Sequence, residues 1–171
     1  MNHEHAVSGV DLRETQAFLS FYRAHLPAVY AYLHRLCGGD TPLAEDLTQD
    51  TFLALVDAVN AGRSDVGDVR WLMTVARHRF LDHARRRDRA TRKLVMLHGR
   101  PDHDPREPTE QEVLSTMSSL QPLHRLVLTL RYVDDLSVPT VADTIGRSIS
   151  ATNSLLARAR TELRAQLGSA T

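Results

Sequence analysis

Apolar side chains recur three or four residues apart in several stretches of this chain, and glycines or prolines separate the stretches. Leu123, Leu126 and Leu130, for example, fall on one face of a helix, because an α-helix repeats every 3.6 residues. No stretch shows the convincing alternation of apolar and polar residues that a half-buried strand requires. The spacing therefore predicts an all-α fold.

Capping residues and breakers mark the expected helix ends in the first half of the chain. Asp11 with Glu14 forms a plausible capping box for a first helix, and Pro27 predicts the start of a second. The glycines at 38–39 should end that second helix. Thr41 should then cap a third helix, since threonine oxygens accept hydrogen bonds from the free N–H groups of a first turn.

The rest of the chain contains one expected loop and five further helices. Residues 60–69 include two glycines and little periodicity, and they predict a loop. Helical spacing resumes near Asp68 and continues through a tryptophan and a run of arginines. After residue 108 the spacing predicts four short helices at 110–119, 122–134, 138–145 and 149–167.

Proline content divides the chain into two expected domains. Residues 98–108 hold three prolines among charged residues and predict a flexible linker between a domain at 1–97 and a domain at 109–171. Within the second domain, Gly146 separates a short helix from a longer one. This arrangement is typical of a helix-turn-helix, which inserts its last helix into the DNA major groove.

The formal charge is balanced, with 21 basic and 21 acidic residues, but the charges are segregated along the chain. Residues 69–100 carry 10 bases and 2 acids, and an acidic block precedes this segment. A helix dipole needs only one or two cations at its C-terminal end. So dense a cluster should repel itself unless an anion neutralises it, and a phosphate backbone is a suitable anion.

Several classes of protein are disfavoured by the composition. No apolar run of about eighteen residues is present, and the first residues lack the layout of a signal peptide, so we expect a cytoplasmic protein. Cys37 is the only cysteine. It cannot form an internal disulfide or a cysteine-rich zinc site, and we expect it to act as a small buried apolar side chain.

An acidic arc on residues 44–56 has two possible interpretations, a solvated face or a docking surface. Glu45, Asp46, Gln49 and Asp50 fall on one side of this expected helix. A magnesium site of the kind found in all-α nucleotide pyrophosphatases is disfavoured, because the third position is Gln49 and no second acidic pair follows.

His78 and His83 lie about 140° apart around a helix, so shared metal ligation is poor. We therefore expect no metal, no cofactor and no catalytic centre.

Three segments together resemble a known family. AEDLTQDTFLALV is similar to the core-binding helix, WLMTVARHRFLDHARRR to the promoter-reading helix, and residues 120–160 to the C-terminal helix-turn-helix domain of extracytoplasmic-function (group-four) sigma factors of bacterial RNA polymerase. The resemblance spans about residues 12–167. It implies a protein that directs promoter-specific transcription initiation through two helical domains, sigma regions 2 and 4.

The resemblance also implies roles for particular residues. The acidic helix would dock on the clamp coiled coil of the polymerase core through Asp46, Gln49 and Asp50, and the core flap would be a second contact. Melting of the minus-ten element and capture of flipped bases would use the loop and the basic helix. The residues implied for the minus-ten element are Asn60, Arg63, Ser64, Trp71, Arg77, His78, Asp82, Arg85, Arg86 and Arg87.

Reading of the minus-thirty-five element would fall to the last helix and the turn before it. The residues implied are Arg147, Ser148, Ser150, Asn153, Ser154 and Arg158. Relatives commonly have cations where this chain has Asn153 and Leu155, and losing two cations should lower phosphate affinity. Asn153 could instead read an adenine edge through paired hydrogen bonds.

Regulation by an anti-sigma factor, which would hide both DNA-binding faces, is also implied by the family. Two other functions remain open at this stage. A conventional helix-turn-helix regulator would bind duplex DNA without polymerase. An all-α nucleotide hydrolase would show magnesium-dependent turnover that requires Glu45 and Asp46.

Overall fold

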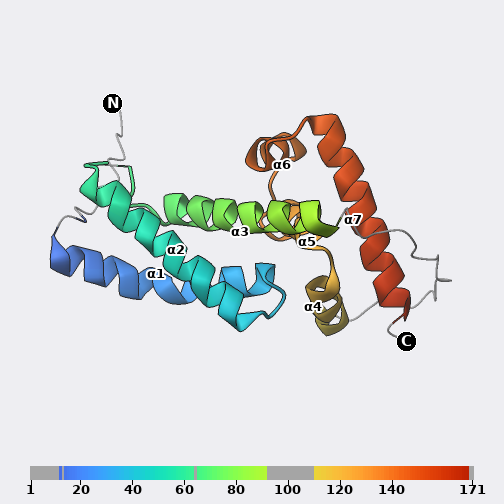
Figure 1. The fold of residues 1–171 in the computed structure, drawn as a ribbon, viewed down its shortest axis with the longest axis horizontal. Helices are drawn as coiled ribbons and strands as arrows, with labels where there is room; N and C mark the ends of the chain where they lie inside the picture. Colours follow the sequence, from blue (N-terminus) through green and yellow to red (C-terminus); the bar gives the residue numbers. More distant parts are fainter. Residues whose placement is uncertain (1–11, 13, 64, 92–109, 170–171) are drawn as a thin grey trace, which may run out of the picture.

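All regular elements in the described part of the chain are helices (Figure 1). The structure, a computed structural model, describes residues 12, 14–63, 65–91 and 110–169. The predicted all-α fold with two helical domains is confirmed. The predicted linker at 98–108 lies outside the described residues. The elements are α1 (Thr15–Leu36), α2 (Thr41–Asn60), α3 (Val69–Thr91), α4 (Glu110–Ser119), α5 (Pro122–Leu128), the π-helix η1 (Thr129–Val133), α6 (Val138–Ile145) and α7 (Ile149–Ser169).

Helix α1 is one continuous helix of 22 residues, so the prediction of a new helix at Pro27 is wrong. A proline inside a helix removes one backbone hydrogen bond. Here the exposed Pro27 is followed by Val29 and Leu33, which are fully buried and continue the apolar face that Phe21 begins. Burial of that face on both sides of the proline stabilises the helix through it. The N-cap residue is Glu14, without a side-chain capping bond, and Asp11 lies outside the described residues.

The corner between α1 and α2 is built from two glycines and an aspartate. Gly38 and Gly39 have φ angles of 70° and 84°, which a glycine adopts without strain and which end α1 as predicted. Asp40, not Thr41, caps α2, because its side chain accepts a hydrogen bond of 3.1 Å from the backbone N–H of Leu43. Aspartate caps a helix at least as well as threonine, so the prediction was one residue too late.

Helix α3 packs on α1 and α2 through one narrow face. Leu72, Ala76, Phe80 and Ala84 lie four residues apart and are at most 1% exposed. Trp71 is only half-buried and lies at the edge of this face. Cys37 is buried at the end of α1, as predicted, and burial raises the pKa of its thiol to about 12. The exposed arginines of α3 are Arg70, Arg86, Arg87 and Arg89.

The second helical group contains a turn that the sequence did not predict. The helix expected at 122–134 begins as α5 but continues after Leu128 as η1, in which the N–H of Asp134 donates to the carbonyl of Thr129 at 2.9 Å. Helices α6 and α7 form the predicted helix-turn-helix, with Gly146 in the left-handed conformation at a φ of 61°. None of the described helices is long and apolar enough to span a membrane.

The two helical groups touch each other. The C-terminal half of α3 extends beyond α1 and α2 and lies against α5, and the end of α1 also reaches α5 (Figure 1). The buried residues of both groups belong to one apolar core cluster, from Leu12 in the first group to Ala159 in the second. The side chains at this junction determine which parts of α3 are accessible.

Candidate functional site

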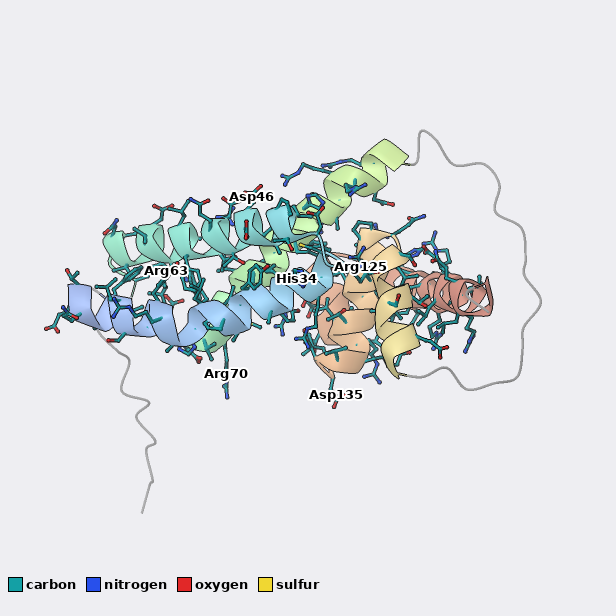
Figure 2. All side chains as sticks on the ribbon, turned by 90° about the horizontal axis from the view of Figure 1, so that it is seen from below. His34, Asp46, Arg63, Arg70, Arg125 and Asp135 are labelled. Carbon is teal, nitrogen blue, oxygen red and sulfur yellow. The ribbon has the colours of Figure 1, made fainter. Side chains whose placement is uncertain are left out.

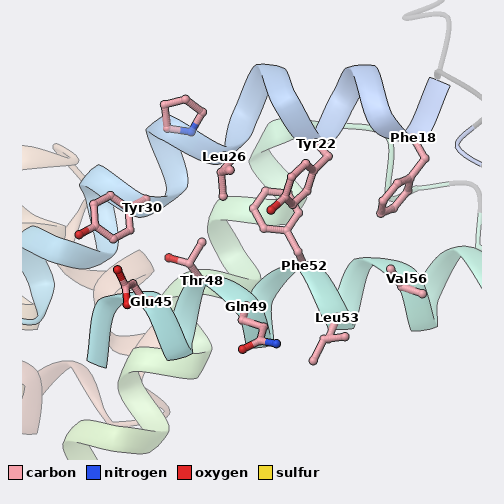
Figure 3. A pocket seen from close by; sticks show the side chains of 11 residues that line it. Phe18, Tyr22, Leu26, Tyr30, Glu45, Thr48, Gln49, Phe52, Leu53 and Val56 are labelled. Atoms are coloured by element: carbon pink, nitrogen blue, oxygen red, sulfur yellow. The ribbon is translucent and has the colours of Figure 1, made fainter. Parts of the chain in front are cut away.

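The acidic face of α2 is exposed. Asp46, Gln49 and Asp50 are all open to solvent, and Figure 2 places Asp46 on the outer side of the helix. They neighbour a groove of about 690 Å³ between α1 and α2, shown in Figure 3. Aromatic and aliphatic side chains line most of this groove, and Glu45 and Gln49 stand at its edge. An apolar groove beside carboxylates fits a helix of a protein partner better than a phosphate.

Leu53 is a residue of this surface that the sequence analysis missed. Its side chain lines the groove, yet it is 52% exposed, whereas the neighbouring Phe52 is only 6% exposed. The sequence did contain a signal for this position, namely its place around the helix. Leu53 lies outside the stripe that the buried Leu47 and Leu55 form, so an apolar side chain there is left exposed. An exposed leucine beside a polar rim is the usual composition of a protein contact.

The loop between α2 and α3 presents a preorganised arginine. Arg63 donates two hydrogen bonds to the carboxylate of Asp65, from Nε at 3.0 Å and from Nη2 at 2.6 Å. Its guanidinium carbon also lies 5.7 Å from the ring centroid of Trp71. The hydrogen bond from Arg63 lowers the pKa of the Asp65 carboxyl group. Asn60 is exposed at the end of α2, and Ser64 lies outside the described residues.

The polar face of α3 divides into two sets. His78, Asp82, Arg86 and Arg87 are exposed. Arg77 and Arg85 are instead half-buried, because both contact the second helical group. All six side chains come from one helix, but contacts with the second helical group half-bury Arg77 and Arg85 and leave the other four exposed.

Arg77 takes part in a polar cluster with Tyr32 and Asp134. Its Nε donates to the Tyr32 hydroxyl at 3.1 Å, and its Nη2 donates to Oδ2 of Asp134 at 3.0 Å. Tyr32 in turn donates to the same Asp134 oxygen at 2.9 Å. Burial raises the pKa of the Tyr32 phenol, so it stays protonated and able to donate. Neither Tyr32 nor Asp134 was singled out by the sequence, and neither carries a local pattern that could have identified it.

The outer face of α7 is open. Ser150, Asn153, Ser154 and Arg158 are all exposed. The Ser154 hydroxyl donates to the Ser150 carbonyl at 3.1 Å, and Arg158 Nε donates to the Ser154 carbonyl at 3.4 Å, so both hydrogen bonds stay within the helix. Ser148 precedes the helix and accepts from the Ala151 N–H at 3.2 Å, as an N-cap does. The preceding Arg147 is half-buried.

Leu155 does not belong to this outer face. It is 2% exposed and packs in the apolar core. The interpretation of Leu155 as a lost DNA-facing cation is therefore wrong, because this position points inward. Of the two departures noted in the sequence, only Asn153 lies where it could contact DNA.

Titratable side chains in the described ranges do not gather into a metal centre. No group of three or more histidine, cysteine, aspartate or glutamate residues in these ranges could hold a metal ion. His83 is half-buried, and burial together with Arg87 and Arg86 lowers the pKa of its imidazole.

Comparison with known proteins assigns both helical groups to one family. The family model described as sigma-70 region 2 matches residues 21–90, and the model described as sigma-70 region 4 matches residues 110–163. Together the two matches cover more than half of the chain. The chain belongs to the sigma-70 family, among the extracytoplasmic-function sigma factors. It is a sigma factor that directs RNA polymerase to promoters.

Curated relatives agree with this assignment. The sigma factor is 27% identical to RNA polymerase sigma factor YlaC of Bacillus subtilis, over 90% of this chain and 93% of the relative. It is 31% identical to the ECF RNA polymerase sigma factor SigM of the same organism, over 84% of this chain and 91% of the relative.

A solved structure shares the fold. The sigma factor RpoE of Bartonella quintana, solved with the anti-sigma factor NepR, matches 89% of this chain with a TM-score of 0.55 at 24% identity, and 97% of that chain is covered. In the protein described here, the region 2 match includes α2, the loop after it and most of α3. The region 4 match includes α4 to α6 and most of α7.

Proposed function

We propose that α2 is the surface on which this sigma factor docks polymerase core. The exposed residues Asp46, Gln49 and Asp50 supply polar contacts, and the groove beside them receives apolar side chains of the partner. The observation that supports this assignment is the exposed Leu53 beside the acidic rim, 52% exposed in a helix whose other large apolar residues are mostly covered. Clamp coiled coil and flap are the parts of core that the family resemblance names.

We infer that the loop after α2 and the basic face of α3 open the minus-ten element. Arg63 and Trp71 lie close enough to stack, and an aromatic ring beside a cation is a suitable platform for an unstacked base. The exposed Arg86 and Arg87 would contact the phosphate backbone. Asn60, Ser64, His78 and Asp82 complete the proposed contact set, together with Arg77 and Arg85.

Helix α7 is proposed to read the minus-thirty-five element in the major groove. Asn153 lies on its exposed face, and an asparagine amide can form paired hydrogen bonds with adenine. Ser148, at the amino end of the helix, and Arg147 would position the helix on phosphates. Ser150, Ser154 and Arg158 lie along the same exposed face.

The proposed domains are 1–97 and 109–171, joined by 98–108. The protein would act in the cytoplasm by binding alone, with no reaction or cofactor of its own. Its expected regulator is an anti-sigma factor, a partner named in the solved RpoE complex.

Transcription in vitro with purified polymerase core tests this proposal. We expect promoter-specific transcripts that require the protein, and a pull-down that retains it on core. The double variant Asp46→Lys with Asp50→Lys should weaken core binding about tenfold or more, since like charges would face each other. Asp135→Lys changes an exposed aspartate of the other helical group and should leave core binding unchanged. Retention of the double variant on core at the wild-type level would contradict the assignment of α2 as the docking surface.

A further inference from the structure

A cavity of about 960 Å³ lies where the end of α1 faces the second helical group. Its walls come from α1, the glycine corner after it, α4, α5, η1 and α7. None of the described residues that line it belongs to α2 or α3, so it is separate from the surfaces proposed for core and for the minus-ten element. Pockets of several hundred Å³ commonly hold a small organic molecule.

The inner surface of this cavity is mostly apolar. Large apolar side chains that are exposed in the described part of the chain are Leu53, Tyr132, Val133 and Ile149. Tyr132 and Val133, at 56% and 58% exposed, both line the cavity. Both belong to the π-helix η1, and π turns inside helices are frequent at functional sites. The turn therefore presents uncovered apolar surface to the cavity.

One side of the cavity carries positive charge, and none of its described lining residues is acidic. Arg160 and Arg164 lie one turn apart on α7, and both line the cavity. Arg160 Nη1 donates to the Tyr132 hydroxyl at 3.3 Å, and this hydroxyl retains its own hydrogen to donate to a ligand. Guanidinium groups bind carboxylate and phosphate oxygens through paired hydrogen bonds. These side chains therefore form a suitable site for an anionic head group.

Arg125 adds a buried positive charge behind the cavity wall. It is 6% exposed and donates to the Leu120 carbonyl at 3.0 Å, but its Nε and Nη1 have no hydrogen-bond partner among the described residues. A Cβ atom added at Gly38 would lie 2.0 Å from Nη1 and 2.8 Å from the Ser118 carbonyl oxygen. Gly38 and Ser118 both line the cavity, and Figure 2 shows Arg125 at this end of α1. An anion in the cavity would offset this charge.

We propose that this cavity binds a small amphiphilic anion. Arg160 and Tyr132 bond its carboxylate or phosphate head group, and its apolar chain packs on Leu128, Val133 and Leu163. An uncharged apolar molecule gains nothing from the arginines, and a bare inorganic anion leaves the apolar lining in water, so the ligand needs both parts. The proposal is independent of the roles proposed for α2, α3 and α7 in transcription.

Four probes test the required chemistry by isothermal titration calorimetry of the full chain, without DNA or core. Octanoate and octyl phosphate carry both a charged head and an apolar chain, 1-octanol lacks the charge, and inorganic phosphate lacks the chain. We expect one of the two amphiphilic anions to bind at a single site at least roughly tenfold more tightly than 1-octanol or phosphate. The tighter of the two identifies the head group. Equally tight binding of 1-octanol or of phosphate would overturn the proposal, as would the absence of saturable binding of both amphiphilic anions.

A matched pair of arginines tests the head-group site. Arg160→Gln and Arg158→Gln remove the same charge from exposed positions two residues apart on α7, but only Arg160 lines the cavity. Arg160→Gln should weaken binding of the tighter amphiphilic anion roughly fivefold to tenfold, because a charged hydrogen bond is lost. Arg158→Gln should stay within about twofold of wild type. Equal losses in the two variants would indicate general charge attraction and overturn the assignment.

A matched pair of exposed apolar residues tests the chain site. Val133 and Ile149 are 58% and 51% exposed, so glutamine at either position leaves the buried core unchanged, and only Val133 lines the cavity. Val133→Gln should weaken binding of the amphiphilic anion roughly threefold to tenfold, and Ile149→Gln should match wild type. Far-UV circular dichroism checks that both variants keep their helices. Wild-type affinity in Val133→Gln would place the ligand elsewhere and overturn the proposal.

Discussion

Helices α3 and α7 both carry residues proposed to contact DNA, but they present these residues differently. On α7, Asn153 and Arg158 are exposed, and Arg158 donates a hydrogen bond within its own helix. On α3, Arg77 and Arg85 are bound by the other helical group. The comparison shows that a cationic sequence does not by itself define an available cationic surface, because tertiary contacts select which arginines remain accessible.

The largest effect is expected on α3, where it tests whether the exposed arginines contact DNA. Reversing Arg86 and Arg87 to glutamate places negative charge on the exposed part of the helix, where we propose phosphate contacts. Open-complex formation with polymerase core should fall by roughly 100-fold, and the salt dependence of binding should weaken by about one phosphate contact per arginine. Permanganate footprinting and run-off transcription measure both effects.

The control for this reversal lies on α1, where Arg23 and Arg35 are also exposed. Their reversal to glutamate changes the net charge equally and should leave open-complex formation near wild type. Normal initiation by the Arg86 and Arg87 variant would contradict the proposed role of the basic face.

A smaller effect is expected on α7. Asn153→Ala should lose about 1–3 kcal/mol of discrimination at a single base pair of the upstream element. Competition binding of the holoenzyme to every single-base variant of that element measures the loss. Thr161→Ala, an exposed change two turns later on the same helix, serves as the control. An unchanged preference at every base would exclude Asn153 as a base reader.

A change of about 1 kcal/mol in the free energy of unfolding is expected where α7 packs on α5. Glu162 of α7 accepts a 3.1 Å hydrogen bond from the Gln121 N–H at the start of α5, and it also pairs with His124. Glu162→Gln should therefore lower the free energy of unfolding by about 1 kcal/mol at pH 7. Thermal or urea denaturation, with Glu14→Gln as an exposed control, provides the measurement.

The Glu162 contribution should depend on pH in a defined direction. Burial opposes ionisation, but the bonds from His124 and Gln121 outweigh it and lower the pKa of this carboxyl group below 4.5. A lowered pKa means that the contribution is complete above the unfolded value and is lost as the pH falls through the folded value. The difference between wild type and Glu162→Gln should therefore shrink below about pH 4.5. A difference that grew in acid would contradict the assignment.

The smallest effect is expected at the loop beside α3. Asp65→Asn weakens the pair that holds Arg63 over Trp71, but exposed ion pairs add little to stability. The melting temperature should be unchanged, and single-stranded DNA affinity should change by less than about twofold. Fluorescence of Trp71, the only tryptophan, reports whether the cation moves off the ring. A large loss of stability would show that the loop depends on this pair.

Local patterns predicted most of the helices, because helix periodicity and capping are properties of neighbouring residues. The same patterns failed at Pro27, where burial of residues distant in sequence decided the outcome, and at η1, which has no simple signature. The Tyr32 to Asp134 hydrogen bond joins residues 102 positions apart, and the Arg77 to Asp134 bond joins residues 57 apart. No spacing rule links such residues, so the polar cluster could be found only from the packed structure.

The π-helical turn at Thr129–Val133 has a mechanical consequence for the whole molecule. A π turn accommodates one more residue than an α turn does, so it shifts the angular register of everything that follows. With the same residues in α geometry, Asp134 would lie roughly 100° further around the helix axis, whereas a one-residue deletion that restored α geometry would leave it near its present position. The position of Asp134, and with it the alignment of one half of the protein with the other, therefore depends on the π turn at Thr129–Val133.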